Sequence, residues 1–414
     1  MADRAVDDRV EITELPNGLR IVTERMDSVR SVALGCWVGV GNRDEPDSAS
    51  GSSHFLEHLL FKGSDRWSSR ELSAAIDGIG GDMNAFTSRE YTAYSFRVPE
   101  TGIELAADLL TEVIVRPRLS AEDIDSERLV IREELAMAED APDDLVHMEL
   151  QESLFPAHPL GREVLGTAAT IDAIDCESIR AFHNKWYRPS NMVVAAAGNV
   201  EHRAVVELFD AAFAGLEPGD RPIREAPVSG LRSSISREKA VEQSHVALGW
   251  RGFGLDDQRR HGLGLVNQIL GGGLSSRLFH EVREVRGLAY AVFSSLAGYV
   301  DAGIFTIYAG TNPENTSELL DVVEAELAKI IAEGFTLEEL EIAKGGVAGA
   351  TMIGLEDSAS RMGRLGASVL LRGRVAPLDE LLERILAVDL DELNAIAAEV
   401  FDADHALSIV GPYC

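Results

Sequence analysis

Residues 51–63 read Gly-Ser-Ser-His-Phe-Leu-Glu-His-Leu-Leu-Phe-Lys-Gly, and they place three chemically matched side chains within five positions. His54, Glu57 and His58 are spaced i, i+3 and i+4, so in a helix they are neighbours on one face. Two imidazoles at this spacing can bind one Zn²⁺, while the carboxylate reaches a metal-bound water. The alternative is an ordinary amphipathic helix whose phenylalanine and leucines face the core and whose histidines face solvent.

A catalytic zinc site needs a third protein ligand and one open position, and the candidate ligand lies in residues 119–139. Ser120 followed by Asp123 is typical of a helix N-terminus, and apolar residues recur after it at helical spacing. Glu127 and Glu134 are seven residues apart, which is two helical turns, so they share a face. The alternative is a charged helix that is simply solvated.

Both segments resemble the signatures of the pitrilysin/insulinase family of zinc peptidases, which carry the inverted H-x-x-E-H motif. Residues 51–63 are similar to the family's G-x-x-H-x-x-E-H-x-x-F-K-G almost throughout. Residues 130–135, Val-Ile-Arg-Glu-Glu-Leu, resemble its V-I-x-x-E-[ILM] element and place Glu134 76 positions after His58. The neighbouring Glu133 points about 100° away round the helix. Two further stretches agree: residues 84–92 resemble N-A-x-T-S-x-E-x-T, and residues 283–290 resemble R-x-x-x-G-L-x-Y.

The resemblance implies a zinc-dependent endopeptidase that hydrolyses unfolded peptides or oligopeptides through a glutamate-activated, zinc-bound water. One Zn²⁺ per subunit is expected on His54, His58 and Glu134, with Glu57 as general base and then acid. A second catalytic carboxylate, Glu127, is expected to orient a ligand or the water.

The remaining site residues follow from the same resemblance. We expect the strand with Asn84, Ala85 and Thr87 to receive an extended peptide at a sheet edge. Arg283 and Tyr290 are expected to be catalytic and substrate-binding, contacting the substrate carbonyl and the developing oxyanion. The alternative for this pair is an arginine paired to Glu281 or Glu284 and a core tyrosine.

A faint internal repeat predicts two copies of one domain. Residues 32–35, 120–124 and 193–198 recur as residues 246–249, 336–340 and 407–411, at nearly one offset. We therefore predict a catalytic zinc domain over residues 1–217, a Pro/Gly-rich linker over 218–230 and a degenerate repeat domain over 231–414. At an offset of 214 the zinc-motif positions fall on Gln268, Gly271 and Gly272, which cannot bind the metal.

Short β-rich segments at residues 20–24, 31–40 and 91–98 mix with longer helical ones within the first copy. This pattern predicts an α+β class with two homologous domains. Each domain is expected to be a mostly antiparallel sheet with helices packed on one face.

The composition excludes several function classes. A net charge of −31 argues against nucleic acid, whose phosphates require the opposite sign. No apolar run is long enough for a membrane span, and residues 1–9 lack the apolar core of a signal peptide. Three widely spaced cysteines argue against a disulfide framework, so we expect a reducing, cytoplasmic setting without membrane partners.

Long family members have four such domains, whereas this chain has two. The resemblance therefore implies a homodimer with a composite active site, in which Arg283 and Tyr290 come from the partner of the subunit that supplies zinc. Two alternatives stay open: a non-catalytic structural or regulatory subunit, and the catalytic half of a heterodimeric processing peptidase.

Overall fold

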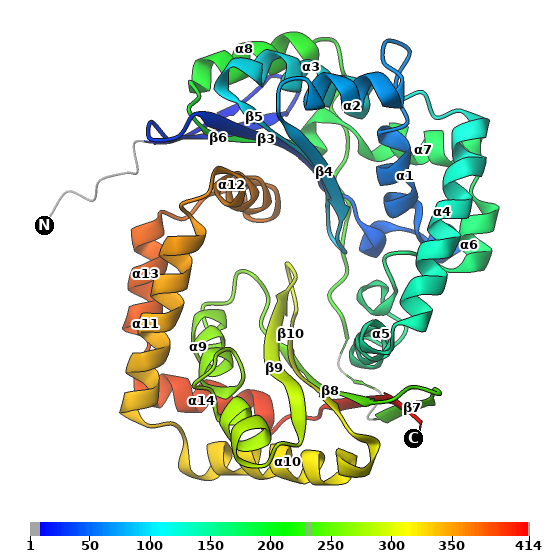
Figure 1. The fold of residues 1–414 in the computed structure, drawn as a ribbon. Helices are drawn as coiled ribbons and strands as arrows, with labels where there is room; N and C mark the ends of the chain where they lie inside the picture. Colours follow the sequence, from blue (N-terminus) through cyan, green and yellow to red (C-terminus); the bar gives the residue numbers. More distant parts are fainter. Residues whose placement is uncertain (1–8, 229, 232–233, 413–414) are drawn as a thin grey trace, which may run out of the picture. The chain divides into compact units, whose positions relative to one another are not determined.

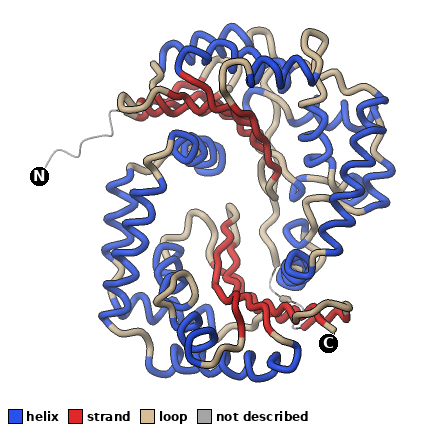
Figure 2. The backbone as a smooth tube through the Cα atoms, in the orientation of Figure 1, coloured by secondary structure: helices blue, strands red, loops and turns tan. Residues whose placement is uncertain are grey.

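A computed structural model describes residues 9–228, 230–231 and 234–412 (Figure 1). The chain divides into two compact units, and each unit contains one β-sheet with helices (Figure 2). The first unit comprises Met1–Leu135, Glu163–Arg224 and Gly354–Pro377, and the second comprises Ala136–Arg162, Glu225–Ile353 and Leu378–Cys414. Residues 1–8 of the N-terminal stretch considered above, and Cys414, lie outside the described residues.

The sheet of the first unit has six strands in the order β1-β2-β6-β3-β5-β4. Their bounds are Val10–Glu14 (β1), Arg20–Arg25 (β2), Ser31–Val38 (β3), Asp82–Thr87 (β4), Thr92–Pro99 (β5) and Met192–Gly198 (β6). Only the β2/β6 pair is parallel among these neighbours, and the other pairs are antiparallel. The central strand β3 is buried from Val32 to Val38, so it lies between two packed layers.

The helices of the first unit lie mainly on one face of this sheet. Their bounds are Ser52–Leu60 (α1), Ser69–Asp77 (α2), Ile103–Val115 (α3), Ala121–Asp140 (α4, which runs on into the second unit), Ala168–Ala173 (α6), Cys176–Trp186 (α7), His202–Ala212 (α8) and Ser358–Arg372 (α12). The main core of the unit includes Phe55, Leu56, Leu59 and Leu60 of α1. The apolar face expected for residues 51–63 therefore holds this helix in place.

The sheet of the second unit has five strands in the order β7-β11-β8-β10-β9. Their bounds are Ser234–Glu238 (β7), Ser244–Gly252 (β8), Ala289–Gly298 (β9), Gly303–Thr311 (β10) and Ala406–Gly411 (β11). The helices of this unit are Pro142–Leu154 (α5), Arg260–Leu270 (α9), Thr316–Glu333 (α10), Leu337–Gly354 (α11), Leu378–Ala387 (α13) and Leu390–Phe401 (α14), with a π-helix, η6, over Phe279–Val285.

The order of pairing is the same in the two sheets once β1 is set aside. The strand order β2-β6-β3-β5-β4 corresponds to β7-β11-β8-β10-β9, and in both sheets the first pair is parallel and the rest are antiparallel. The predicted α+β class with two homologous, mostly antiparallel domains is confirmed.

The prediction of helices on one face alone is incomplete, because one further helix covers the opposite face of each sheet. In the first unit this helix is α12, whose Met362, Leu365 and Val369 pack on Trp37 and its neighbours. In the second unit it is α5, whose apolar side chains pack on strand residues such as Ala247 and Val410.

Both covering helices come from the other half of the sequence, so the units are not continuous in sequence. The change from one half to the other falls at Arg224 and Glu225, inside the Pro/Gly-rich stretch 218–230. The predicted boundaries at 217 and 231 assign residues 136–162 to the first domain and residues 354–377 to the second. In the structure, residues 136–162 belong to the second unit and residues 354–377 to the first. The reason is physical: strands such as β3 are apolar on both faces and need a second layer.

Gly366 shows how closely α12 approaches its sheet. A Cβ atom at this position would lie 2.2 Å from the Trp37 ring. Glycine is therefore required here by close packing of helix on strand. In the described part of the chain, no helix is both long enough and apolar enough to cross a membrane.

Candidate metal centre and active site

The zinc-motif helix α1 begins in a way that the motif itself does not reveal. Gly51 precedes it with φ of 92°, a left-handed conformation that favours glycine. The buried carboxylate of Glu45 then accepts hydrogen bonds from the backbone N–H groups of Gly51, at 2.7 Å, and Ser53, at 2.6 Å. A carboxylate at a helix N-terminus pairs with free N–H groups and with the helix dipole, so it fixes where α1 starts.

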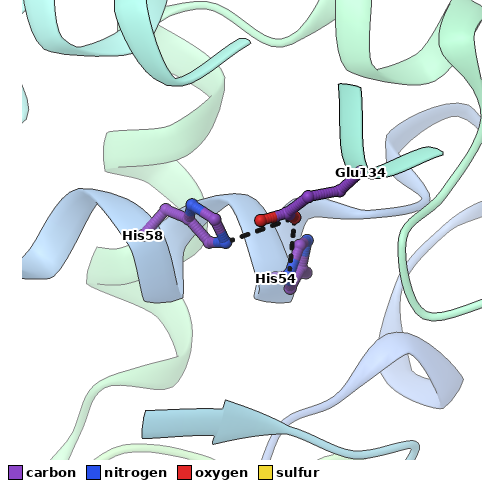
Figure 3. A group of neighbouring side chains, drawn as sticks. All are labelled: His54, His58 and Glu134. Atoms are coloured by element: carbon purple, nitrogen blue, oxygen red, sulfur yellow. Dashed lines mark ion pairs between the residues drawn. The ribbon is translucent and has the colours of Figure 1, made fainter. Parts of the chain in front are cut away.

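His54, His58 and Glu134 converge on one point in the first unit (Figure 3). The two histidines project from α1, and Glu134 reaches them from α4. Its Oε2 atom lies 3.6 Å from Nε2 of His54 and 3.6 Å from Nε2 of His58. One potential ligand atom from each residue lies within 4.8 Å of the others.

This donor set fits Zn²⁺. Ligands about 2.1 Å from a tetrahedral ion lie about 3.4 Å apart, close to the 3.6 Å between Glu134 Oε2 and each imidazole nitrogen. Burial, with a smaller contribution from the neighbouring His58, lowers the pKa of His54 to about 4. The His54 imidazole is therefore neutral near pH 7, which a metal ligand requires.

Glu127 lies behind His58. Its Oε2 atom lies 3.0 Å from Nδ1 of His58, and its Oε1 atom forms an ion pair with Lys62. An Nδ1–H bonded to a carboxylate leaves Nε2 unprotonated and aimed at the metal position. Only 4% of Glu127 is exposed, so this residue is not part of a solvated helix face.

Asp123 N also donates to Ser120 Oγ, which confirms the predicted N-cap of α4.

Glu57 lies on the same helix between the two histidines, and its carboxylate is held by Thr87. The Thr87 hydroxyl donates to Glu57 Oε2 at 2.5 Å. Burial raises the pKa of Glu57 above the ordinary glutamate value, while the Thr87 hydrogen bond acts in the opposite direction. A carboxylate with a raised pKa next to a metal position suits a proton acceptor and donor.

Asn84, Ala85 and Thr87 all lie on β4, which forms one edge of the first sheet and pairs with β5. Asn84 is exposed, and Ala85 and Thr87 are half-buried, so successive side chains alternate between the two faces. The motif of residues 84–92 does not form one continuous strand, because β4 ends at Thr87, where Ser88 N and Oγ both donate to Tyr91 O and close a turn.

Arg283 and Tyr290 lie in the second unit and contact each other. Arg283 Nη1 donates to the Tyr290 carbonyl at 3.0 Å, and its guanidinium lies 4.3 Å from the centre of the Tyr290 ring. The Tyr290 side chain is 79% exposed, so the alternative of a core tyrosine is wrong. Arg283 Nε also forms a long ion pair with Glu284 Oε1, at 3.8 Å, so the part of the alternative that pairs this arginine with Glu284 is confirmed.

Comparison with known proteins places this geometry in a family. The family model "Insulinase (Peptidase family M16)" matches residues 20–168, and "Peptidase M16 inactive domain" matches residues 173–347. An uncharacterised zinc protease of Streptomyces coelicolor is 44% identical over 413 residues, covering 97% of this chain and 90% of the relative. The chain belongs to the insulinase (M16) family of peptidases.

A further relative and two solved structures show the same similarity over nearly the whole chain. An uncharacterised zinc protease of Bacillus subtilis is 37% identical and covers 96% of this chain and 97% of the relative. Among solved structures, a protease from Helicobacter pylori has a TM-score of 0.91 at 25% identity, covering 97% of this chain and 99% of that chain. A Pseudomonas fluorescens structure described as a peptidase M16 inactive domain shares the fold, with a TM-score of 0.91 at 24% identity and 98% of each chain covered.

The match of residues 173–347 to the inactive-domain model agrees with the absence of the zinc-motif side chains from the second copy. Helix α9 begins 8 residues after β8 ends, whereas α1 begins 14 after β3, so the offset of 214 does not hold here. Aligning the two helix starts places the zinc-motif positions on Gly262, Leu265 and Val266 instead. The expectation that the second copy lacks these ligands is unchanged by this correction.

Sequence reasoning missed three supporting groups in the first unit. Glu45 and Lys62 lie close to the motif in sequence, but their partners are visible only in three dimensions. A buried charged cluster of Arg43, Glu90, Asp44 and Arg224 was also missed. Its members are up to 181 residues apart, so no local pattern could have found it.

Proposed function

We propose that this protein is an active zinc-dependent endopeptidase that cleaves unfolded peptides or oligopeptides. The observation that carries the proposal is the convergence of His54, His58 and Glu134 at 3.6 Å separations, with Glu57 on the same helix. The relatives from Streptomyces coelicolor and Bacillus subtilis are named zinc proteases, which agrees with this proposal. Zinc bound by the three ligands would lower the pKa of water and polarise the scissile carbonyl.

The chain's own residues account for substrate placement and proton transfer. An extended peptide can add to the edge strand β4, which gains main-chain hydrogen bonds irrespective of side chains. Glu57 then accepts the proton of the attacking water and delivers it to the departing amine. Glu127 keeps His58 oriented throughout, through its bond to Nδ1.

We further propose a homodimer in which Arg283 and Tyr290 of one subunit serve the zinc site of the other. The exposed Tyr290 ring, fixed by its contact with Arg283, supports this role. Donors fixed before the reaction stabilise a developing oxyanion without reorganisation.

The test is a Glu57→Gln variant assayed with a library of quenched fluorescent peptides, with and without a chelator. We expect wild-type cleavage that the chelator abolishes and added Zn²⁺ restores. The variant should retain about one zinc per chain but lose roughly 10²- to 10⁴-fold in kcat. A variant as active as wild type would refute the role of Glu57, and a wild type that cleaves no peptide would refute the function.

A further inference from the structure

Thr87 occupies the point where the edge strand β4 ends and the zinc-motif helix α1 lies beside it. Its hydroxyl reaches Glu57 Oε2 at 2.5 Å, a distance typical of a strong hydrogen bond to a carboxylate. This bond joins two residues that are 30 positions apart. The proton-transferring side chain is therefore tied to the strand at which a peptide would add.

The direction of the Thr87 side chain follows from the pleat of β4. Met83 and Ala85 are half-buried and pack against the core of the first unit, whereas Asn84 and Phe86 are exposed. Residues at every second position share a face of the sheet, so Thr87 belongs with the inward set. Its hydroxyl thus faces the helix, and the backbone edge of the strand stays available for a substrate.

The turn that follows Thr87 is held by buried charges. Arg43 Nη1 donates to Glu90 Oε1 at 2.7 Å, and these two side chains are only 2% and 3% exposed. Arg224 pairs with Asp44 through two hydrogen bonds of 2.8 Å, and also donates to the Glu90 carbonyl. Two cations and two anions balance one another, so this cluster fixes the turn at residues 88–91 and hence the end of β4.

Glu57 needs such a fixed partner because a glutamate side chain has three rotatable bonds. Ordering this side chain costs rotamer entropy, and a charge-assisted hydrogen bond offsets that cost. Valine has the shape of threonine but no donor, so it removes this bond and leaves the packing intact. Serine keeps the donor with one methyl group fewer.

We propose that Thr87 is a positioning residue that orients the Glu57 carboxylate, with the cluster of Arg43, Asp44, Glu90 and Arg224 holding the turn that fixes it. The inference rests on the proposed function, in which Glu57 transfers the proton. This role differs from the substrate-binding role that the family resemblance implies for Thr87, and the two roles predict different kinetics.

The experiment compares Thr87→Val, Thr87→Ser and wild type with a quenched fluorescent decapeptide at saturating Zn²⁺. A positioning role predicts that Thr87→Val lowers kcat about 10- to 100-fold with KM within about twofold, because small misplacements of a reacting group are costly. Thr87→Ser should stay within about threefold of wild type. A substrate-binding role predicts instead a raised KM with an unchanged kcat, and that result would overturn the proposal.

The matched control is Thr111→Val, which removes a buried hydroxyl that donates to Ala107 O of the same helix, α3. Zinc content should be equal in all variants, and the melting temperatures of Thr87→Val and Thr111→Val should fall by similar amounts, because each variant loses one hydrogen bond. Crystal structures of wild type and Thr87→Val give a readout that needs no activity, with the Glu57 carboxylate in one position in the first and displaced or spread in the second. An identical Glu57 position in both structures would refute the positioning role even if wild type cleaved no peptide.

Discussion

Replacing Glu127 by glutamine should weaken zinc binding about 10- to 100-fold, which is about 1.4–2.7 kcal/mol. The carboxylate faces two donors, His58 Nδ1 at 3.0 Å and the ammonium of Lys62. An amide has a single acceptor oxygen, so its NH₂ group must face one of these donors. An unsatisfied buried donor costs about 1–3 kcal/mol, which agrees with the loss of zinc-binding free energy given above.

The assay is a competition titration of Zn²⁺ between the protein and a chromophoric chelator at fixed pH. The control is Glu133→Gln, which makes the same chemical change on the same helix at an exposed position. Because Glu127 contacts His58, the proposed ligand, and not the substrate, kcat at saturating Zn²⁺ should fall far less than in Glu57→Gln. Equal zinc affinity in the Glu127 and Glu133 variants would refute the reasoning that Glu127 orients His58.

Two other perturbations test the remaining parts of the molecule. Mixing Glu57→Gln with Tyr290→Phe subunits should restore about a quarter of wild-type activity after subunit exchange. The reason is that half of the dimers would then hold one intact composite site out of two. Activity no higher than that of either variant alone would indicate a self-contained site. Glu90→Gln removes the negative charge that lies 2.7 Å from the buried Arg43, and should lower the free energy of unfolding by about 3–5 kcal/mol, or the melting temperature by roughly 6–20 °C. A calorimetric scan measures this loss, and a shift as small as that of the exposed Glu133→Gln would contradict the stabilising role of the cluster.

The proposed zinc ligands and Glu57 could be predicted from the sequence because much of their geometry is local. His54, Glu57 and His58 are fixed relative to one another by one helix, and Glu127 and Glu134 by a second. The pairing between the two helices came from a family spacing, and the 3.6 Å separations agree with it. The strands over residues 20–24 and 31–40 also agreed with the structure to within two residues, since their β-branched and apolar runs are short and bounded by turns.

What could not be predicted depends on contacts between distant segments. The Arg43–Glu90 and Asp44–Arg224 pairs look in sequence like four ordinary surface charges. The family motif assigned Thr87 to substrate binding, and only the distance between its hydroxyl and the Glu57 carboxylate revealed their hydrogen bond. The covering helices α5 and α12 have ordinary amphipathic patterns, and nothing in such a pattern says which sheet a helix will cover.

The reciprocal placement of α5 and α12 limits how this chain can be taken apart. A gene fragment that stops in the linker would encode the first sheet without α12, and would leave Trp37 and its apolar neighbours without their cover. The complementary fragment would lack α5 and expose Ala247 and Val410 in the same way. Each fragment would carry the helix that the other one needs, so neither fragment would contain both layers that cover its sheet.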